Sequence, residues 1–128
     1  MGDIVEVRCD HCGLSEQYML GVGRTHHIIK VIEESFDEEL QDRVHEMLLS
    51  APEDWSFERS LGQCQSCGKL SVVPALLYRG GTEGSIHGKC ACGGELRIRS
   101  LEQMTGGDVP DCPQCGTKMK TEQAGYWD

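Results

Sequence analysis

Eight cysteines are the residues of this sequence with the clearest capacity for chemistry, and all of them occur in close pairs. A glycine directly follows every pair, and the pairs are Cys9 and Cys12, Cys64 and Cys67, Cys90 and Cys92, and Cys112 and Cys115. Two thiolates at this spacing can point at one ion from a tight turn, and the glycine tolerates the positive φ that such a turn requires. Two pairs complete a tetrahedron, so the spacing predicts two closed metal sites of four cysteines each.

Disulfides and redox thiols are the alternatives to structural metal sites. One isolated Cys-x-x-Cys motif would be weak support for metal, but four pairs with no leftover cysteine favour it. Disulfides are rare in reducing compartments, which argues against four of them in a cytoplasmic protein. We therefore expect two zinc ions, with iron as an alternative, because a tetrahedral four-thiolate site suits either metal. Aromatic residues are sparse near the pairs, which favours zinc over a redox iron site.

The intervals between the pairs predict which pairs share an ion. Nineteen residues separate the third pair from the fourth, 22 separate the second from the third, and 51 separate the first from the second. Where two such cysteine turns, called knuckles, share one ion, the usual interval between them is roughly 15 to 20 residues. We therefore expect a sequential arrangement, in which the third and fourth pairs share one ion and the first and second pairs share the other. The alternative is a nested arrangement, in which the middle pairs share one ion and the outer pairs the other.

Histidines offer few further ligands. The pair Cys90 and Cys92 is one residue shorter than the others, and His87, three residues before it, is the obvious substitute ligand. A solvated loop histidine is the more ordinary role for His87. His26 and His27 have no regular ligand spacing around them and are expected to face solvent near the start of a helix.

The distribution of charge limits the classes of partner. The chain has 128 residues, with 21 acids, 12 bases and a formal net charge of -9. Residues 33–60 carry ten acids and two bases, whereas residues 61–128 carry seven of each. This argues against a chain-wide basic face for nucleic-acid backbones. Two four-thiolate zinc centres would lower the formal charge to about -13, because each adds -2.

Hydrophobic patterning predicts a few elements around a small core. Leu, Ile, Val and Phe make up only 27 residues, so metal must supply stability that the core lacks. Alternation predicts short strands at 3–8 and 95–99, and a run interrupted by Pro74 predicts a bent or edge strand at 69–78. Glycine pairs at 80–81 and 106–107 mark turns.

An acidic amphipathic helix is predicted at about 36–49. Residues 35–38 have the capping-box pattern, and apolar residues then recur at helical intervals until Pro52 ends the pattern; they are Phe36, Leu40, Val44, Met47 and Leu48. The apolar face is expected to pack against the rest of the fold. Residues 25–34 are compatible with a first helix or a buried strand.

Catalytic and membrane signatures are missing from the sequence. The glycines at 21 and 23 lack the third glycine and the Lys-Ser/Thr ending of phosphate loops, and there is no nucleophile elbow or zincin motif. The paired acids at 33–34 and 38–39 are expected to form a solvated face, since catalytic carboxylates need burial and separated pKa values. No apolar run approaches the roughly 18 residues of a membrane span, and the first residues lack a signal-peptide pattern. We expect a cytoplasmic protein that is not an enzyme.

The knuckles themselves resemble those of a known class. Cys-Gln-Ser-Cys-Gly at 64–68 and Cys-Pro-Gln-Cys-Gly at 112–116 resemble the knuckles of zinc-ribbon proteins of the rubredoxin-like type. More narrowly, the first pair, Leu-Gly-Val-Gly at 20–23, the acidic helical segment and the second pair resemble small uncharacterised bacterial zinc-ribbon proteins over about the first 75 residues. The resemblance implies structural metal at the eight cysteines. It also implies docking onto protein or nucleic acid in transcription, translation or protein assembly.

These features predict a small metal-stabilised α+β fold of two β-hairpin zinc ribbons with an acidic helical insert in the first. The first ribbon is expected at residues 1–80, with the insert at about 25–58, and the second at residues 81–128. We expect a protein-interaction or adaptor module whose partner is another protein. One alternative is a nucleic-acid-binding ribbon that acts in transcription or translation through the second half, where Arg97 and Arg99 share a strand face with Lys118 and Lys120 nearby. The other is a rubredoxin-like iron or thiol-redox protein.

Overall fold

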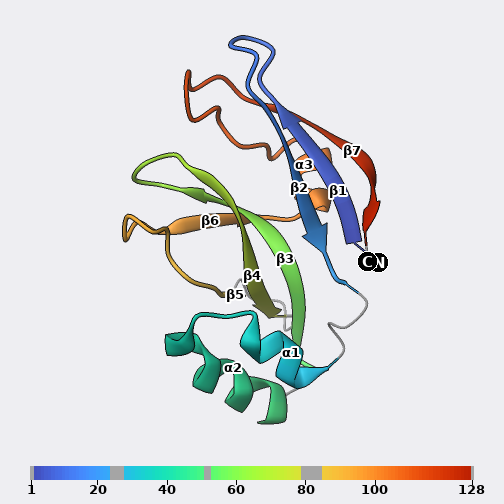
Figure 1. Ribbon diagram of the computed structural model, residues 1–128, viewed down its shortest axis with the longest axis vertical. Coiled ribbons are helices and arrows are strands. Elements are labelled where there is room, and N and C mark those ends of the chain that lie inside the picture. Colours follow the sequence, from blue (N-terminus) through green and yellow to red (C-terminus); the bar gives the residue numbers. More distant parts are fainter. Residues whose placement is uncertain (1, 24–27, 51–52, 79–84, 128) are drawn as a thin grey trace.

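A computed structural model describes residues 2–23, 28–50, 53–78 and 85–127 as an antiparallel sheet with three helices (Figure 1). The strand order is β5-β4-β3-β2-β1-β7, and β6 pairs with β3. The strands are β1 (Gly2–Arg8), β2 (Ser15–Gly21), β3 (Trp55–Cys64), β4 (Leu70–Tyr78), β5 (Ser85–Ile86), β6 (Leu96–Arg99) and β7 (Lys120–Trp127). The helices are α1 (Ile29–Glu34), α2 (Glu38–Ser50) and α3 (Leu101–Thr105). The α+β class predicted from the sequence is confirmed. None of these helices has the length and apolar character to cross a membrane.

The sheet consists of two halves with a narrow connection. One half contains β2, β1 and β7, and the other contains β6, β3, β4 and β5 (Figure 1). β2 and β3 are registered through Gly21 and Arg59. Arg59 adds to this contact, since its Nε donates to the carbonyl oxygen of Met19 at 3.0 Å and its guanidinium lies 5.3 Å from the Trp127 ring centroid. One arginine therefore contributes much of the connection between the halves.

Long-range pairings bring distant parts of the chain together. β1 pairs along its whole length with β7, from Gly2 opposite Trp127 to Arg8 opposite Lys120. β3 pairs with β6 from Leu61 to Cys64. Both pairings join residues from either side of position 80. Strand pairing therefore brings together knuckles that are far apart in the chain.

Several predicted elements are present. The strands expected at 3–8, 95–99 and 69–78 are β1, β6 and β4. In β4, only Leu76 and Leu77 pair with β5, so no described strand pairs with the outer edge at Pro74, which has no N–H to donate. The turn at 106–107 is confirmed by the positive φ of Gly107. The turn predicted at 80–81, His26, His27 and Pro52 lie outside the described residues.

The amphipathic helix predicted at about 36–49 is present as α2, and its apolar face packs as expected. Val44 and Leu48 belong to a buried cluster with Phe57 of β3 and Leu76 of β4. The helix begins two residues later than predicted, because Phe36 lies in the turn after α1, where its amide donates to the carbonyl of Glu33. The ambiguous segment before it forms a helix in its described part, as α1.

Two apolar clusters make up the core of the part of the chain that the structure describes. The cluster beneath α1 and α2 contains Ile32, Phe36, Val44, Leu48, Phe57, Leu76 and Ile86. The other lies around the β1 half of the sheet and contains Val5, Val7, Cys9, Leu20, Leu61, Met104, Cys112 and Met119. Two of its members are predicted metal ligands. This second cluster is therefore continuous with a cysteine site.

Candidate metal centres

The eight cysteines form two groups of four, and the sulfur atoms within each group all lie within 4.8 Å of one another. Site 1 consists of Cys9, Cys12, Cys112 and Cys115, and site 2 consists of Cys64, Cys67, Cys90 and Cys92. The outer pairs thus share one site and the middle pairs share the other. The sequential arrangement predicted from the intervals is wrong, and the nested arrangement is the one that forms.

Strand pairing explains the nested arrangement. β1 ends at Arg8, directly before Cys9, and Arg8 is paired with Lys120 at the start of β7, so the first and last knuckles lie at the same end of the sheet. In the same way, Cys64 at the end of β3 is opposite Leu96 of β6, which follows the third knuckle. Loop-closure entropy changes only slowly with loop length, so the intervals carry little weight against this pairing.

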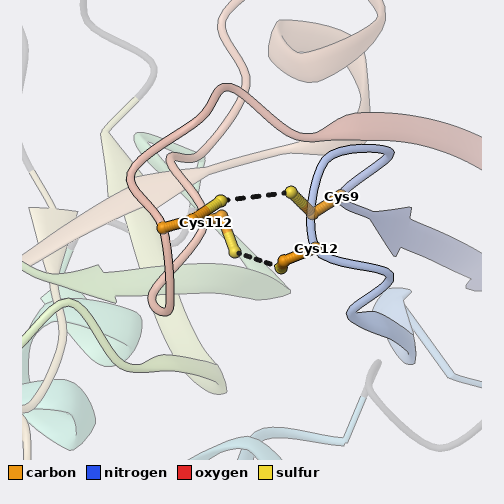
Figure 2. Close-up of side chains that lie close together, drawn as sticks. Cys9, Cys12 and Cys112 are labelled. Carbon is orange, nitrogen blue, oxygen red and sulfur yellow. Dashed lines mark hydrogen bonds between the residues drawn. The ribbon is translucent and has the colours of Figure 1, made fainter.

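The sulfur geometry fits a tetrahedral ion. Figure 2 shows the side chains of Cys9, Cys12 and Cys112 directed toward one another. Sulfurs of different knuckles lie 3.5 Å apart for Cys9–Cys115, Cys12–Cys112 and Cys64–Cys92 and 3.7 Å apart for Cys67–Cys90. A disulfide bond is about 2.05 Å long, whereas zinc with bonds of about 2.3 Å to four sulfurs sets the sulfurs about 3.8 Å apart. The donor set and its spacing therefore fit a four-thiolate metal ion, and every cysteine is free of disulfide bonds.

The four knuckles share one backbone pattern. In each, the amide of the glycine after the pair donates to the carbonyl of the first cysteine, at 2.8 to 2.9 Å. These glycines have φ between +76° and +86°, as the sequence predicted; they are Gly13, Gly68, Gly93 and Gly116. In site 2, the amides of Ser66 and Cys67 also donate to the sulfur of Cys64, at 3.4 and 3.3 Å. Such bonds favour the thiolate form that a metal requires.

The short third knuckle fits against the second because a second glycine follows it. A Cβ added to Gly94 would lie 2.6 Å from the sulfur of Cys64 and 2.8 Å from the hydroxyl of Ser66. A side chain at this position would therefore enter site 2. The sequence signal for this close approach is the second glycine of the pair that follows Cys92.

His87 lies outside both groups of ligands. The four positions of site 2 are filled by cysteine sulfurs. His87 is half-buried, and its Nδ1 lies 2.9 Å from the carbonyl oxygen of Gly88, to which it can donate. The short spacing of Cys90 and Cys92 therefore does not bring a histidine into the site.

Without a cation, hydrogen bonds within each site lower the pKa of some thiols and raise the pKa of others. The amide of Cys67 lowers the pKa of Cys64 to about 6, and the hydrogen bond with the Thr117 hydroxyl lowers the pKa of Cys115 to about 5. The pKa of Cys12 rises to about 12, because hydrogen bonds from the neighbouring sulfurs outweigh the lowering effect of the Leu14 backbone. In site 2, the Gly94 backbone lowers the pKa of Cys92, but hydrogen bonds with the neighbouring sulfurs outweigh this and raise it to about 12. Each site thus combines one thiol of lowered pKa with one thiol of raised pKa. A divalent cation would favour the thiolate form of all four.

The four basic residues considered for nucleic-acid binding are paired with carboxylates. Arg97 and Arg99 both contact one carboxylate and so share a face, as predicted. The pairs are Arg97–Asp108 at 2.9 Å, Arg99–Asp108 at 3.1 Å, Lys118–Asp111 at 3.8 Å and Lys120–Asp10 at 2.6 Å. The Arg99 hydrogen bond is the main cause of a lowered pKa at Asp108. Much of the positive charge in this region is therefore locally neutralised.

The comparisons with known proteins do not assign the chain to a family. No protein-family model matches the chain, and no curated protein or solved structure is significantly similar to it. The two cysteine groups are compatible with sites of the zinc-ribbon type. What the structure shows is a small α+β protein with two groups of cysteines that can hold metal ions.

Proposed function

We propose that this chain is a non-catalytic zinc-binding protein in which two structural four-cysteine sites stabilise the fold and α1 and α2 contact a protein partner. The observation that carries the proposal is the gathering of all eight sulfurs into two groups of tetrahedral dimensions. Four protein ligands leave no open coordination position, which is typical of structural rather than catalytic zinc. The zinc would supply cross-links between strands that are distant in sequence.

Hairpins support the interpretation as two zinc ribbons. β1 and β2 form an antiparallel hairpin with the first knuckle at its turn, and β3 and β4 form a second hairpin with the second knuckle at its turn. α1 and α2 lie between these hairpins in the chain and occupy one end of the molecule (Figure 1). The remaining two knuckles complete the sites.

Elemental analysis of the purified protein tests the metal assignment. We expect two zinc ions per chain, a colourless protein and, after cobalt substitution, the intense visible absorption of tetrahedral thiolate coordination. A red, bleachable protein would assign iron to the same sulfurs and favour the rubredoxin-like alternative. Failure of the reduced protein to bind either metal would contradict the proposal.

The acidic helical pair is the surface that we assign to a protein partner. Glu38 and Glu39 lie in the first turn of α2, and exposed apolar side chains occur at the start of α1 and in the last turn of α2, with Ile28 44%, Ile29 39% and Leu49 60% exposed. A partner with basic and apolar side chains complements this surface. The carboxylate partners of Arg97, Arg99, Lys118 and Lys120 count against nucleic acid as the ligand.

Photo-crosslinking from position 49 tests the partner assignment. We expect crosslinked proteins to be lost at high salt and in a variant with Glu38→Gln, Glu39→Gln and Asp42→Asn, because charge attraction is removed while the apolar side chains remain. Unchanged crosslinking in that variant, or tight salt-sensitive binding of the protein to DNA or RNA, would contradict the assignment.

A further inference from the structure

Two knuckles that belong to different metal sites lie against each other. The knuckle at 64–68 contributes to site 2 and the knuckle at 112–116 contributes to site 1. A Cβ added to Gly68 would lie 3.9 Å from the Cα of Pro113. Both loops line one groove of about 550 Å³, together with the side chains of Gln63, Arg97 and Arg99. A knuckle of one site therefore lies next to a knuckle of the other.

Gln63, which directly precedes Cys64, connects these knuckles through one side chain. Its Nε2 donates to the carbonyl of Gly68 at 3.2 Å and to the carbonyl of Asp111 at 2.7 Å. Its Oε1 accepts from the amide of Asp111 at 3.3 Å and from Arg99 at 3.4 Å. A glutamine amide offers two donors and two lone pairs, so all four are used. The side chain thus bonds both backbone groups of the residue before Cys112.

Arg99 extends the same connection into the sheet. Its side chain is 6% exposed, and its Nε donates to Asp108 at 3.1 Å. Arg99 belongs to β6, which pairs with β3 beside Cys64, whereas Asp108 lies in the segment that leads to Cys112. The last knuckle of site 1 is therefore attached to the two strands that carry the knuckles of site 2.

We propose that Gln63 is a positioning residue that couples the two metal centres, so that an ion in one site raises the affinity of the other. An ion that fixes the 64–68 knuckle fixes the amide of Gln63, which in turn holds the 112–116 knuckle in place for its own ion. Coupling of this kind is reciprocal and amounts to roughly tenfold in affinity in typical cases. The proposal rests on the proposed function, since both sites must bind metal.

Native mass spectrometry of a zinc titration measures this coupling directly, because it counts chains with no ion, one ion and two ions. For two sites of equal affinity, about half of the chains carry one ion at half saturation, and tenfold coupling lowers this to about a quarter. We expect the one-ion fraction to rise in Gln63→Met, which keeps the length of the side chain and removes its hydrogen bonds. Gln65→Met is the matched control, because Gln65 is exposed, follows Cys64 and lines the same groove.

A second measurement separates coupling from local support of site 1. The affinity of site 1 is compared with and without Gln63→Met, both in the full protein and in a background with Cys67→Ser and Cys92→Ser, which removes site 2. Coupling predicts a several-fold loss of affinity with site 2 intact and a much smaller loss without it. If Gln63 only supports the structure of site 1, the loss of metal affinity is the same in both backgrounds. That result would overturn the proposal.

Other outcomes are equally decisive. Equal one-ion fractions in the wild type and Gln63→Met would overturn the coupling, and so would an equal rise of this fraction in Gln65→Met. In either case, two ions per wild-type chain would leave the proposed function intact. Gln63→Glu keeps the acceptor atoms and should give an intermediate one-ion fraction. If Gln63→Met and Gln63→Glu both bound no metal, Gln63 would support the fold alone and the proposal would fail. Fewer than two ions in the wild type would end both proposals.

Discussion

Within each Cys-x-x-Cys knuckle, the two cysteines occupy different environments. Cys9, Cys64 and Cys112 are buried, whereas Cys12, Cys67 and Cys115 are exposed. The first cysteine therefore contributes to the core as well as to the site, while the second contributes a ligand with little packing. Substitution of the exposed cysteines separates the loss of metal from the loss of core contacts.

Pairs of exposed cysteines test the nested arrangement. A chain with Cys12→Ser and Cys115→Ser damages only site 1, so we expect it to retain one zinc ion. A chain with Cys12→Ser and Cys67→Ser damages both sites, so we expect it to retain none. Native mass spectrometry under reducing conditions gives both numbers. The sequential arrangement would reverse the two results, because Cys12 and Cys67 would then share a site.

Glu58 on β3 is a carboxylate whose burial opposes ionisation. Burial raises its pKa above the usual 4.5, and the Ser60 hydroxyl, which donates to Oε1 at 3.0 Å, only partly offsets this. Ionised Glu58 therefore lowers folded-state stability at pH values above its raised pKa, and this cost disappears as the pH falls to the unfolded-state pKa. We expect Glu58→Gln to stabilise the metal-loaded protein at pH 7.

Urea unfolding of wild type and Glu58→Gln over a pH series checks this expectation. The stability difference should shrink as the pH falls through the raised pKa and vanish below 4.5, where Glu58 is protonated in both the folded and the unfolded state. Comparison at each pH cancels effects that the two proteins share. A difference that is independent of pH would show that ionisation of Glu58 is not its cause.

The packing of the knuckles depends on glycines, because a side chain at some of these positions would meet a ligand sulfur. Gly94→Ala would place a methyl group against the sulfur of Cys64, so we expect weaker metal binding at site 2 by about tenfold or more, with site 1 less affected. Gly125→Ala is the control, because the nearest described atom to its Cβ would belong to Ile4, at an ordinary 3.7 Å. Competition with a chromophoric chelator measures both variants. Equal affinities would contradict the close approach.

Elements with strong patterns could be predicted from the sequence, and those held by their neighbours could not. β1 and α2 have clear periodicity because one face of each is buried. β7 is mostly exposed, including Tyr126 at 63%, so its sequence carries little alternation and its pairing with β1 defines it. α3 has a capping box formed by Ser100 and Gln103, but five residues are too few for a periodic signal. The ligands could be predicted because spacing is local, whereas their partners depend on the pairing of distant strands.

At the scale of the whole molecule, metal and core stabilise the fold together. Cys9 and Cys112 belong to the cluster that also contains Val5, Val7 and Leu61, so loss of metal removes ligands and core contacts at the same place. Structural zinc contributes on the order of 10 kcal/mol, comparable to the whole stability of a small domain. We expect chelation under reducing conditions to unfold the protein, with loss of its circular dichroism spectrum. Native spectra after complete removal of metal would contradict this.

The nested sites also impose an order on assembly during synthesis. Site 2 has all its ligands once residue 92 has left the ribosome, whereas Cys9 and Cys12 must wait for Cys112 and Cys115. At roughly 5 to 20 residues per second, about a hundred residues take about 5 to 20 s. During this interval the nascent chain carries half of a metal site, with two thiols open to oxidation or to a competing metal. Site 1 is therefore completed after site 2, although its first two ligands are synthesised before any ligand of site 2.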